Sequence, residues 1–411
     1  MVKGDRIVGI DIGTTKICTI VAEVEEEGGL KITGVGSAPS DGLKRGVVVN
    51  VEKTVKSIQE AIDRAEQMSD TRITAVYAGI AGDHIRSFNS RGVIAVSGPE
   101  NEITGNDEAR VIEAAKAINI PLDREIVHVL PQDFLVDDQP GIKDPIGMSG
   151  VRLEADVHIV TGAVTSAQNI CKSIRRAGVE VVDLVLEPIA SSYAVLTPDE
   201  EEMGCLLVDI GGGTSDIAVF YGGSIRHTAV VGLGGENVTQ DISIGMRTPV
   251  KQAEELKRMH GCALSSLVSK EEVIEVPGIA GRPPNKVERA EMTAIIEARM
   301  DEIFSLVHRE LMRTDYAHLL AAGVVVTGGG AMVDGCAELA EEIFDMPVRI
   351  GTSRNVTGLV DAVTQPIYAT GVGLVQFGLN HQNREGHLVN GNGEMFNSIL
   401  GRMKGWVKDF F

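Results

Sequence analysis

Two short segments of this chain, one near the N-terminus and one near the middle, have almost the same pattern. The first reads Ile7-Val-Gly-Ile-Asp11-Ile-Gly-Thr-Thr-Lys16, and the second reads Leu206-Leu-Val-Asp209-Ile-Gly-Gly-Gly-Thr-Ser-Asp216. Each is an apolar run that ends in Asp, Gly and hydroxyl residues, which predicts a buried strand entering a tight hairpin. The backbone N–H groups of such a hairpin are free to face an anion. A duplicated phosphate loop predicts two similar lobes with a nucleotide between them.

The residue types in these loops suit a phosphate chain and a magnesium ion. Glycine lets the backbone approach phosphate oxygens, hydroxyl groups donate hydrogen bonds to them, and lysine adds a positive charge. Phosphate repels carboxylates, so we expect Asp11 and Asp209 to hold Mg²⁺, mostly through its waters. We expect Asp216 to support a water or an adjacent backbone group. The predicted nucleotide-binding residues of the two loops are Gly13, Thr14, Thr15, Lys16, Gly211, Gly212, Gly213, Thr214, Ser215 and Asp216.

A third apolar strand also ends in glycines. Residues 323–330 read Gly-Val-Val-Val-Thr-Gly-Gly-Gly, and a helical pattern follows from Cys336 to Phe344. A flat base or ribose could lie against the bare backbone of Gly328, Gly329 and Gly330. Taken alone, the same pattern is typical of an ordinary tight turn between a strand and a helix.

These three segments, in this order, resemble the two phosphate loops and the adenosine loop of the actin superfamily, which includes actin, heat-shock chaperones and sugar kinases. Residues 183–193 resemble the hinge helix of that superfamily, with Glu187 as its leading acidic residue, and residues 369–373 resemble the second hinge. Glu254 and Lys257 are similar to the pair that bacterial actins direct at the ribose and adenine, and the resemblance adds Gly235 to the site. It implies an α/β fold of two lobes with a nucleotide cleft between them.

The last residues of the chain differ in character from the rest. Apolar residues recur at helical spacing over 395–411, on an arc of about 120°. Such an amphipathic helix, with basic residues opposite the apolar face, suits the headgroup region of a bilayer; docking on its own domain is the alternative. The residues predicted to contact the membrane are Phe396, Ile399, Leu400, Met403, Trp406, Val407 and Phe410, with Arg402, Lys404 and Lys408.

With an insert in the first lobe and this C-terminus, the chain resembles the FtsA family, bacterial cell-division relatives of actin, over essentially its whole length. Leu130-Pro-Gln-Asp-Phe134 and Gly281-Arg-Pro-Pro284 carry the resemblance without an obvious chemical role. It implies ATP and Mg²⁺ binding, head-to-tail polymerisation, and a position on the cytoplasmic face of the inner membrane at the division site. The expected partners are the FtsZ C-terminal peptide, further copies of the chain, later division proteins such as FtsN, and an anionic membrane surface.

Two single residues receive roles from the resemblance. Arg299, on a helix expected over 293–311, is a candidate contact for the FtsZ peptide, although an exposed arginine is often only solvated. Glu187 is the candidate for holding the water that attacks ATP, because phosphoryl transfer to water needs a positioned nucleophile. A structural Glu-Pro helix start is an equal alternative, and we expect slow ATP hydrolysis at most.

The expected domain boundaries follow this two-lobed arrangement. They are a first-lobe core at 1–82, 164–198 and 362–378, a small α+β insert at 83–163, a second-lobe core at 199–240 and 311–361, an upper subdomain at 241–310, a polar flexible linker at 379–394 and the amphipathic helix at 395–411.

Composition excludes several other functions. The formal net charge of −20 over 411 residues argues against nucleic acid as the main partner. The cysteines have no metal-type spacing and indicate core thiols in a reducing cytoplasm. No apolar run reaches the length of a signal peptide or a membrane span.

The closest alternative is a PilM-like ATP-binding protein of pilus assembly, which is generally shorter and lacks such a tail. A rod-shape actin such as MreB would carry a different insert, and a sugar or acetate kinase would need a second polar site for its phosphoryl acceptor. Aspartic proteases also carry one Asp-x-Gly in each lobe, but they need Thr or Ser where Ile12 and Ile210 stand.

Overall fold

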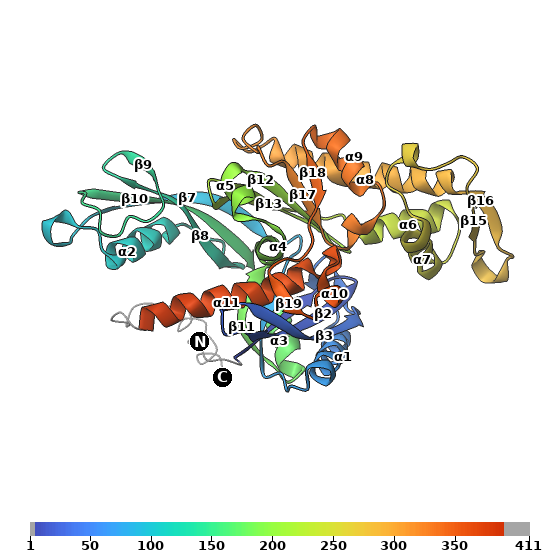
Figure 1. Cartoon of the computed structure of the whole chain (residues 1–411), viewed down its shortest axis with the longest axis horizontal. Helices are drawn as coiled ribbons and strands as arrows, with labels where there is room; N and C mark the ends of the chain where they lie inside the picture. The colour runs from blue at the N-terminus through green and yellow to red at the C-terminus, as the bar shows by residue number, and fades with distance from the viewer. Residues whose placement is uncertain (1–4, 390–411) are drawn as a thin grey trace.

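The computed structural model describes residues 5–389 as two lobes with an insert at one side (Figure 1). The first-lobe core is a six-stranded sheet in the order β11-β6-β1-β2-β3-β19. Helices α1 and α3 cover one face and α4 and α11 cover the other, so its central strands are apolar on both sides. The elements are β1 (Arg6–Ile12), β2 (Lys16–Val24), β3 (Leu30–Pro39), β6 (Ala75–Ile80), β11 (Glu180–Leu186), β19 (Val356–Gly358), α1 (Val51–Ser69), α3 (Val164–Arg176), α4 (Glu187–Val195) and α11 (Ala369–Val389).

The second lobe is built on a five-stranded sheet in the order β14-β13-β12-β17-β18. Its upper subdomain extends away from the insert (Figure 1). The fully buried Phe304 of α8 has its ring 5.8 Å from that of Phe344 on α9. The elements are β12 (Cys205–Ile210), β13 (Ser215–Tyr221), β14 (Ser224–Val231), β17 (Val324–Thr327), β18 (Val348–Ile350), α6 (Gly235–Gly245), α7 (Val250–His260), α8 (Arg289–Leu311), α9 (Cys336–Phe344), β15 (Val273–Val276) and β16 (Asn285–Glu288).

The insert is a four-stranded antiparallel sheet, β7-β10-β8-β9, with α2 packed on one face. A capping box starts α2, because Asp107 accepts hydrogen bonds from the backbone N–H and the hydroxyl of Thr104. The elements are β7 (Arg86–Ala95), β8 (Arg124–Val136), β9 (Gln139–Ile142), β10 (Arg152–Ala163) and α2 (Gly105–Lys116).

Short elements complete the described chain. No helix within residues 5–389 has the length and apolar character needed to cross a membrane. The short elements are β4 (Leu43–Lys44), β5 (Val47–Val48), α5 (Pro198–Met203), α10 (Val360–Val363), and the 3₁₀ turns η1 (Pro99–Asn101), η2 (Ser265–Leu267), η3 (Ile279–Gly281), η4 (Gly329–Met332) and η5 (Pro366–Tyr368).

One expected domain boundary differs from the structure. We expected residues 311–361 to belong to the second lobe, yet β19 joins the first-lobe sheet by parallel pairing with residues 30–32 of β3. The second-lobe segment therefore ends before Val356, because the chain crosses back to cover an edge strand of the other sheet.

The expected linker at 379–394 also differs, since α11 continues to Val389. The ring of Phe377 lies 5.8 Å from that of Tyr193 and 5.9 Å from that of His381. This aromatic packing stabilises the helix beyond residue 378. Gly378 serves close packing, because a β-carbon there would lie 2.7 Å from Ile7 Cγ2. Residues 390–394 of the expected linker lie outside the described part of the chain.

Candidate nucleotide site between the lobes

The two predicted hairpins are present and have matching geometry. Between β1 and β2, the N–H of Gly13 donates to the carbonyl of Lys16 at 3.0 Å. Between β12 and β13, the N–H of Gly211 donates to the carbonyl of Thr214 at 2.9 Å. Two strands from different lobes therefore end in equivalent turns.

The hairpins touch each other across the lobes. A β-carbon added to Gly212 would lie 2.5 Å from Thr15 Cγ2, and one added to Gly213 would lie 2.7 Å from Thr14 Oγ1. The threonines of the first loop thus pack on the bare backbone of the second. A phosphate chain can enter between these loops only if the lobes move apart.

Acidic side chains gather behind the hairpins, where they repel one another. Burial raises the pKa of Asp11 to about 6; the ammonium of Lys16 opposes this shift, and Asp209 adds to it. Burial and the charge of Asp209 raise the pKa of Asp216 to about 8. Burial also raises the pKa of Glu187 well above its ordinary value, with contributions from Asp11, Asp216 and Asp209. Buried carboxylates that repel one another and have raised pKa values are typical of functional sites.

Sequence reasoning missed two hydroxyl residues that hold Asp209. Ser191 Oγ on α4 donates to Asp209 Oδ2 at 2.5 Å, and Thr370 Oγ1 on α11 donates to the same oxygen at 3.2 Å. Burial raises the pKa of Asp209, and these hydrogen bonds act against that rise. Both hydroxyls lie in the segments that resemble hinges, so the resemblance was the signal that could have found them. Together they tie a second-lobe carboxylate to two first-lobe helices.

Lys16 has a different contact from the one expected. Its Nζ donates to the carbonyl of Ile367 at 2.7 Å and lies 4.0 Å from the centre of the Tyr368 ring. The ammonium is therefore held by the turn before α11, close enough to Asp11 to stabilise its charged form.

The carboxylates fit a magnesium ion that keeps its waters. Asp216 Oδ1 is buried without a hydrogen-bond partner, while its Oδ2 accepts from Thr214 Oγ1 at 3.0 Å. Within residues 5–389, no group of three or more His, Cys, Asp or Glu side chains is arranged to hold a metal directly. An octahedral ion with several waters suits this set, with Asp11 and Asp209 as its partners.

The N-terminus of α6 rests on the second hairpin. The N–H of Gly235 donates to the carbonyl of Gly211 at 2.9 Å, and the N–H of Glu236 donates to the carbonyl of Gly212 at 2.8 Å. A β-carbon on Gly234 would lie 2.6 Å from the Gly211 carbonyl oxygen. Backbone hydrogen bonds and close packing thus join the start of the helix to the hairpin.

The expected Glu254 and Lys257 pair lies beside this helix. Lys257 Nζ is 2.7 Å from Glu254 Oε2, and it donates to the carbonyl of Gly235 at 2.9 Å and to Thr239 Oγ1 at 2.8 Å. Thr239, which the sequence did not single out, also donates to Glu254. The pair is therefore fixed next to the second hairpin.

The glycines after β17 pack against β12. Gly328 has a φ of +84°, and a β-carbon there would lie 2.3 Å from Asp209 Oδ1. One on Gly330 would lie 2.3 Å from Ile210 Cγ2, while Gly329 faces the side chain of Ile367 at 3.5 Å. Close approach to the site strand therefore requires glycine at the first and third positions.

Arg299 lies on α8, away from the hairpins. Its Nε is 2.5 Å from Asp241 Oδ2, and it also pairs with Glu302. An open pocket of about 470 Å³ is lined by Asp241, Ala294, Ile295, Ala298, Arg299 and Glu302. The guanidinium is thus held in an ion-pair network at a concave surface.

The residues predicted to contact the membrane belong to the C-terminal segment, beyond Val389. Phe396, Ile399, Leu400, Arg402, Met403, Lys404, Trp406, Val407, Lys408 and Phe410 lie outside the described residues.

The paired hairpins between two sheets define an actin-like ATPase fold, and solved structures share it. The PilM-PilN type IV pilus biogenesis complex matches with a TM-score of 0.67 at 17% identity, over 91% of this chain and 98% of that one. MreB5 of Spiroplasma citri bound to ADP matches with a TM-score of 0.55 at 14% identity, over 94% of this chain and 99% of that one. At these identities the likeness shows the fold alone.

Sequence comparison then identifies the family. The family model for cell division protein FtsA matches residues 206–373, and the model for the SHS2 domain inserted in FtsA matches residues 82–161. Cell division protein FtsA of Pseudomonas aeruginosa is 50% identical over 415 residues, covering 100% of this chain and 99% of that protein. FtsA of Escherichia coli strain K12 is 42% identical, covering 98% and 96%. The chain belongs to the FtsA family of cell division proteins.

Proposed function

We propose that this protein binds ATP with Mg²⁺ in the cleft between its lobes. The observation that carries the proposal is the pair of equivalent hairpins, one from each lobe, with mutually repelling carboxylates behind them. MreB5 of Spiroplasma citri, which shares the fold, has been solved with ADP and with AMPPNP. Nucleotide binding by relatives of the same fold supports the assignment.

Each group at the site has a distinct role in this proposal. The backbone N–H groups and hydroxyls of the hairpins hold the phosphates, and Glu254, Lys257 and the glycines after β17 receive the nucleoside. Asp11 and Asp209 hold the ion through its waters, and Asp216 Oδ1 can accept a further hydrogen bond there. Bound Mg²⁺ would neutralise phosphate charge.

The binding proposal is tested by calorimetry with Mg-ATP on the wild type, Asp11→Asn and Asp63→Asn. We expect Asp11→Asn to weaken binding about 10- to 100-fold, while the free protein becomes more stable because a repelling buried charge is removed. Asp63 is exposed on α1 and serves as the control. Unchanged affinity of Asp11→Asn would refute the assignment.

We propose Glu187 as the residue that positions the hydrolytic water, with slow turnover at most. Its side chain lies over Gly79, where a β-carbon would be 3.2 Å from Glu187 Cγ, and its raised pKa suits a proton acceptor. Phosphate release measured for Glu187→Gln tests the role. Turnover equal to that of the wild type removes the assignment.

We also propose that the protein polymerises on the inner face of the cytoplasmic membrane and anchors FtsZ there. Many weak amphipathic helices along one filament would bind lipid by avidity. Flotation on anionic liposomes compares the full chain with a 1–393 truncation, each with and without Mg-ATP. We expect only the full chain to float, and more strongly with nucleotide. Flotation of neither protein contradicts membrane anchoring.

The FtsZ C-terminal peptide is proposed to bind the second lobe near Arg299, and the insert is proposed to recruit later division proteins such as FtsN. The open pocket that Arg299 lines supports the first assignment, because it offers a recessed surface to a short peptide segment. Fluorescence anisotropy with the FtsZ peptide compares Arg299→Ala with Arg313→Ala, an exposed arginine just beyond α8. Equal affinities of the two variants would exclude Arg299.

A further inference from the structure

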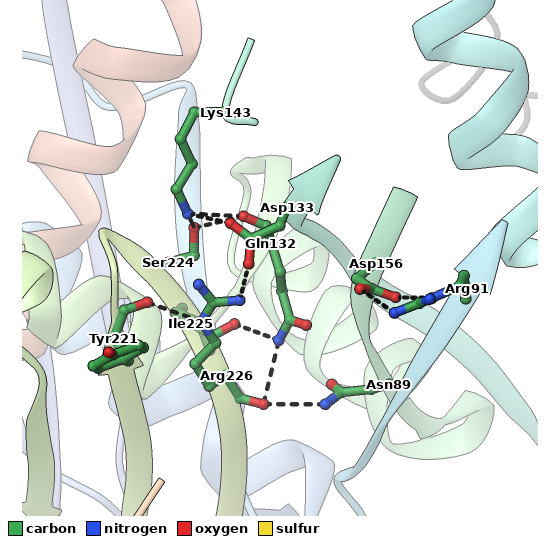
Figure 2. Close-up of polar contacts among 10 residues, drawn as sticks. All are labelled: Asn89, Arg91, Gln132, Asp133, Lys143, Asp156, Tyr221, Ser224, Ile225 and Arg226. Atoms are coloured by element: carbon green, nitrogen blue, oxygen red, sulfur yellow. Dashed lines mark hydrogen bonds and ion pairs between the residues drawn. The ribbon is translucent and has the colours of Figure 1, made fainter. Parts of the chain in front are cut away.

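The insert contacts the second lobe along one edge of the second-lobe sheet (Figure 2). β14 is the terminal strand there, and an edge strand presents carbonyl groups that no neighbouring strand satisfies. Side chains of the insert satisfy them instead. Gln132 Nε2 donates to the carbonyl of Ile225 at 2.7 Å, and Ser87 Oγ donates to that of Thr228 at 2.7 Å.

A partly buried ion pair lies at the centre of this contact. A bulge in the β13–β14 ladder leaves Arg226 without a strand partner, and its side chain, 8% exposed, pairs with Asp133 of β8. Lys143 Nζ lies 2.8 Å from the other oxygen of Asp133 and donates to Ser224 Oγ at 3.0 Å (Figure 2). Burial alone would raise the pKa of Asp133, but the hydrogen bonds and charges of both cations hold it below its usual value. Separating the pair leaves the guanidinium of Arg226, the buried partner, without its counter-charge.

A histidine continues the contact toward the cleft. His158 of β10 has one ring nitrogen 2.7 Å from Asn89 Oδ1 and the other 2.9 Å from Thr228 Oγ1. Asn89 Nδ2 in turn donates to the carbonyl of Arg226 at 3.4 Å. The insert therefore holds β14 at several points along its length.

The other end of β14 is part of the nucleotide site. Val231 pairs with Ser215, the first residue of β13 after the second hairpin. A β-carbon on the next residue, Gly232, would lie 2.6 Å from Asp83 Oδ1, in the segment that joins β6 of the first lobe to β7 of the insert. Three residues later, Gly235 begins the helix that rests on the second hairpin. One strand thus runs from the insert to the phosphate loop.

We propose that these contacts form a latch that resists opening of the nucleotide cleft. The insert latch comprises Ser87, Asn89, Gln132, Asp133, Lys143 and His158 of the insert together with residues 224–228 of β14. The insert is continuous with the first lobe at β6 and α3, so parting the lobes pulls β14 away from it. Because the hairpins already touch, phosphates can enter or leave only after such parting. The latch therefore sets the rate of nucleotide exchange, an inference that rests on the proposed ATP binding.

Release of a preloaded fluorescent ATP analogue, chased with excess Mg-ATP, tests the latch. Asp133→Asn removes a charge that bridges the insert and the second lobe. Asp156→Asn is the matched control, since Asp156 pairs with Arg91 entirely within the insert (Figure 2). We expect Asp133→Asn to release the analogue about tenfold faster than the wild type, and Asp156→Asn to stay within about twofold.

A second variant keeps the test decisive if Asp133→Asn fails to fold. Gln132→Ala removes hydrogen bonds to β14 without leaving Arg226 unpaired, and we expect it to release the analogue about threefold to tenfold faster. Release from both variants at the control's rate overturns the latch.

Hydrogen exchange tests the latch without nucleotide. We expect Ser224–Val231 to exchange faster in Asp133→Asn than in Asp156→Asn, and equal exchange again overturns the latch. If the wild type bound no ATP analogue, the proposed function would fail. The hydrogen-exchange comparison would still show whether the insert holds β14.

Discussion

Single glycines decide how tightly the strands of the site can be approached. Gly328 combines a positive φ with a position directly against Asp209, whereas Gly178, just after α3, has a similar φ of +91° with nothing within 4 Å of an added β-carbon. The two positions therefore separate the cost of backbone conformation from the cost of a steric clash.

We expect Gly178→Ala to lower the free energy of unfolding by about 1 kcal/mol, the cost of a left-handed conformation for alanine. Gly328→Ala should lower it by about 3 kcal/mol, because the methyl group also displaces Asp209. It should abolish Mg-ATP binding as well, whereas Gly178→Ala retains it. Chemical denaturation and calorimetry measure both effects. Equal destabilisation by the two variants would contradict the steric argument.

Single elements were predicted best where local sequence decides them. The bounds of α9 agree with the helical pattern predicted for Cys336 to Phe344, because amphipathic spacing is a local property. Capping is local too, since the Asn50 side chain accepts a hydrogen bond from the N–H of Lys53 at the start of α1. α11 extends beyond the expected hinge because Phe377 and Gly378 pack on residues far away in sequence. The composition of the expected linker, residues 379–394, is polar and rich in glycine. No local signal in the sequence could therefore have predicted that the helix continues there.

The start of α2 provides a prediction at this scale. Asp107 accepts from Thr104 Oγ1 at 2.7 Å and from Arg110 Nη1 at 2.8 Å, and it is buried. We expect Asp107→Ala to destabilise the insert by about 2 kcal/mol, because the helix loses its cap and Arg110 its partner. Hydrogen exchange over α2 should speed up accordingly. Asp63→Ala, at an exposed position of α1, should leave all hydrogen exchange unchanged. Protection of α2 in Asp107→Ala equal to that in the wild type would refute the role.

At the scale of the whole molecule, opposing sets of titratable groups couple stability to pH. Burial lowers the pKa of His158 to about 3, with His227 contributing, and lowers that of His128 to about 4. A histidine whose pKa is lowered by folding stabilises the protein fully above about pH 6.5, and this contribution is lost as the pH falls toward 4. The raised pKa values of Asp11 and Asp216 act in the opposite sense, since their contribution is lost as the pH rises.

Comparing variants isolates the histidine contribution. We expect the stability of the wild type to fall more steeply between pH 6.5 and pH 4 than that of His158→Gln, by up to about 1.4 kcal/mol per pH unit. His318→Gln, at an exposed site, should retain the wild-type slope. Urea denaturation across this range gives the slopes. A His158→Gln slope equal to the wild-type slope would show that the ring is not buried neutral.

The sequence by itself determined the two lobes, the paired hairpins and the acidic residues behind them, because strand periodicity and turn chemistry are local properties. The family resemblance supplied Glu254 and Lys257, which do lie beside the second hairpin. Only the tertiary structure decided which distant groups complete the site. Ser191 and Thr370 reach Asp209 from separate helices, and the insert satisfies β14 through contacts between residues about 90 to 140 positions apart. Such contacts depend on how the lobes pack, which no local pattern encodes.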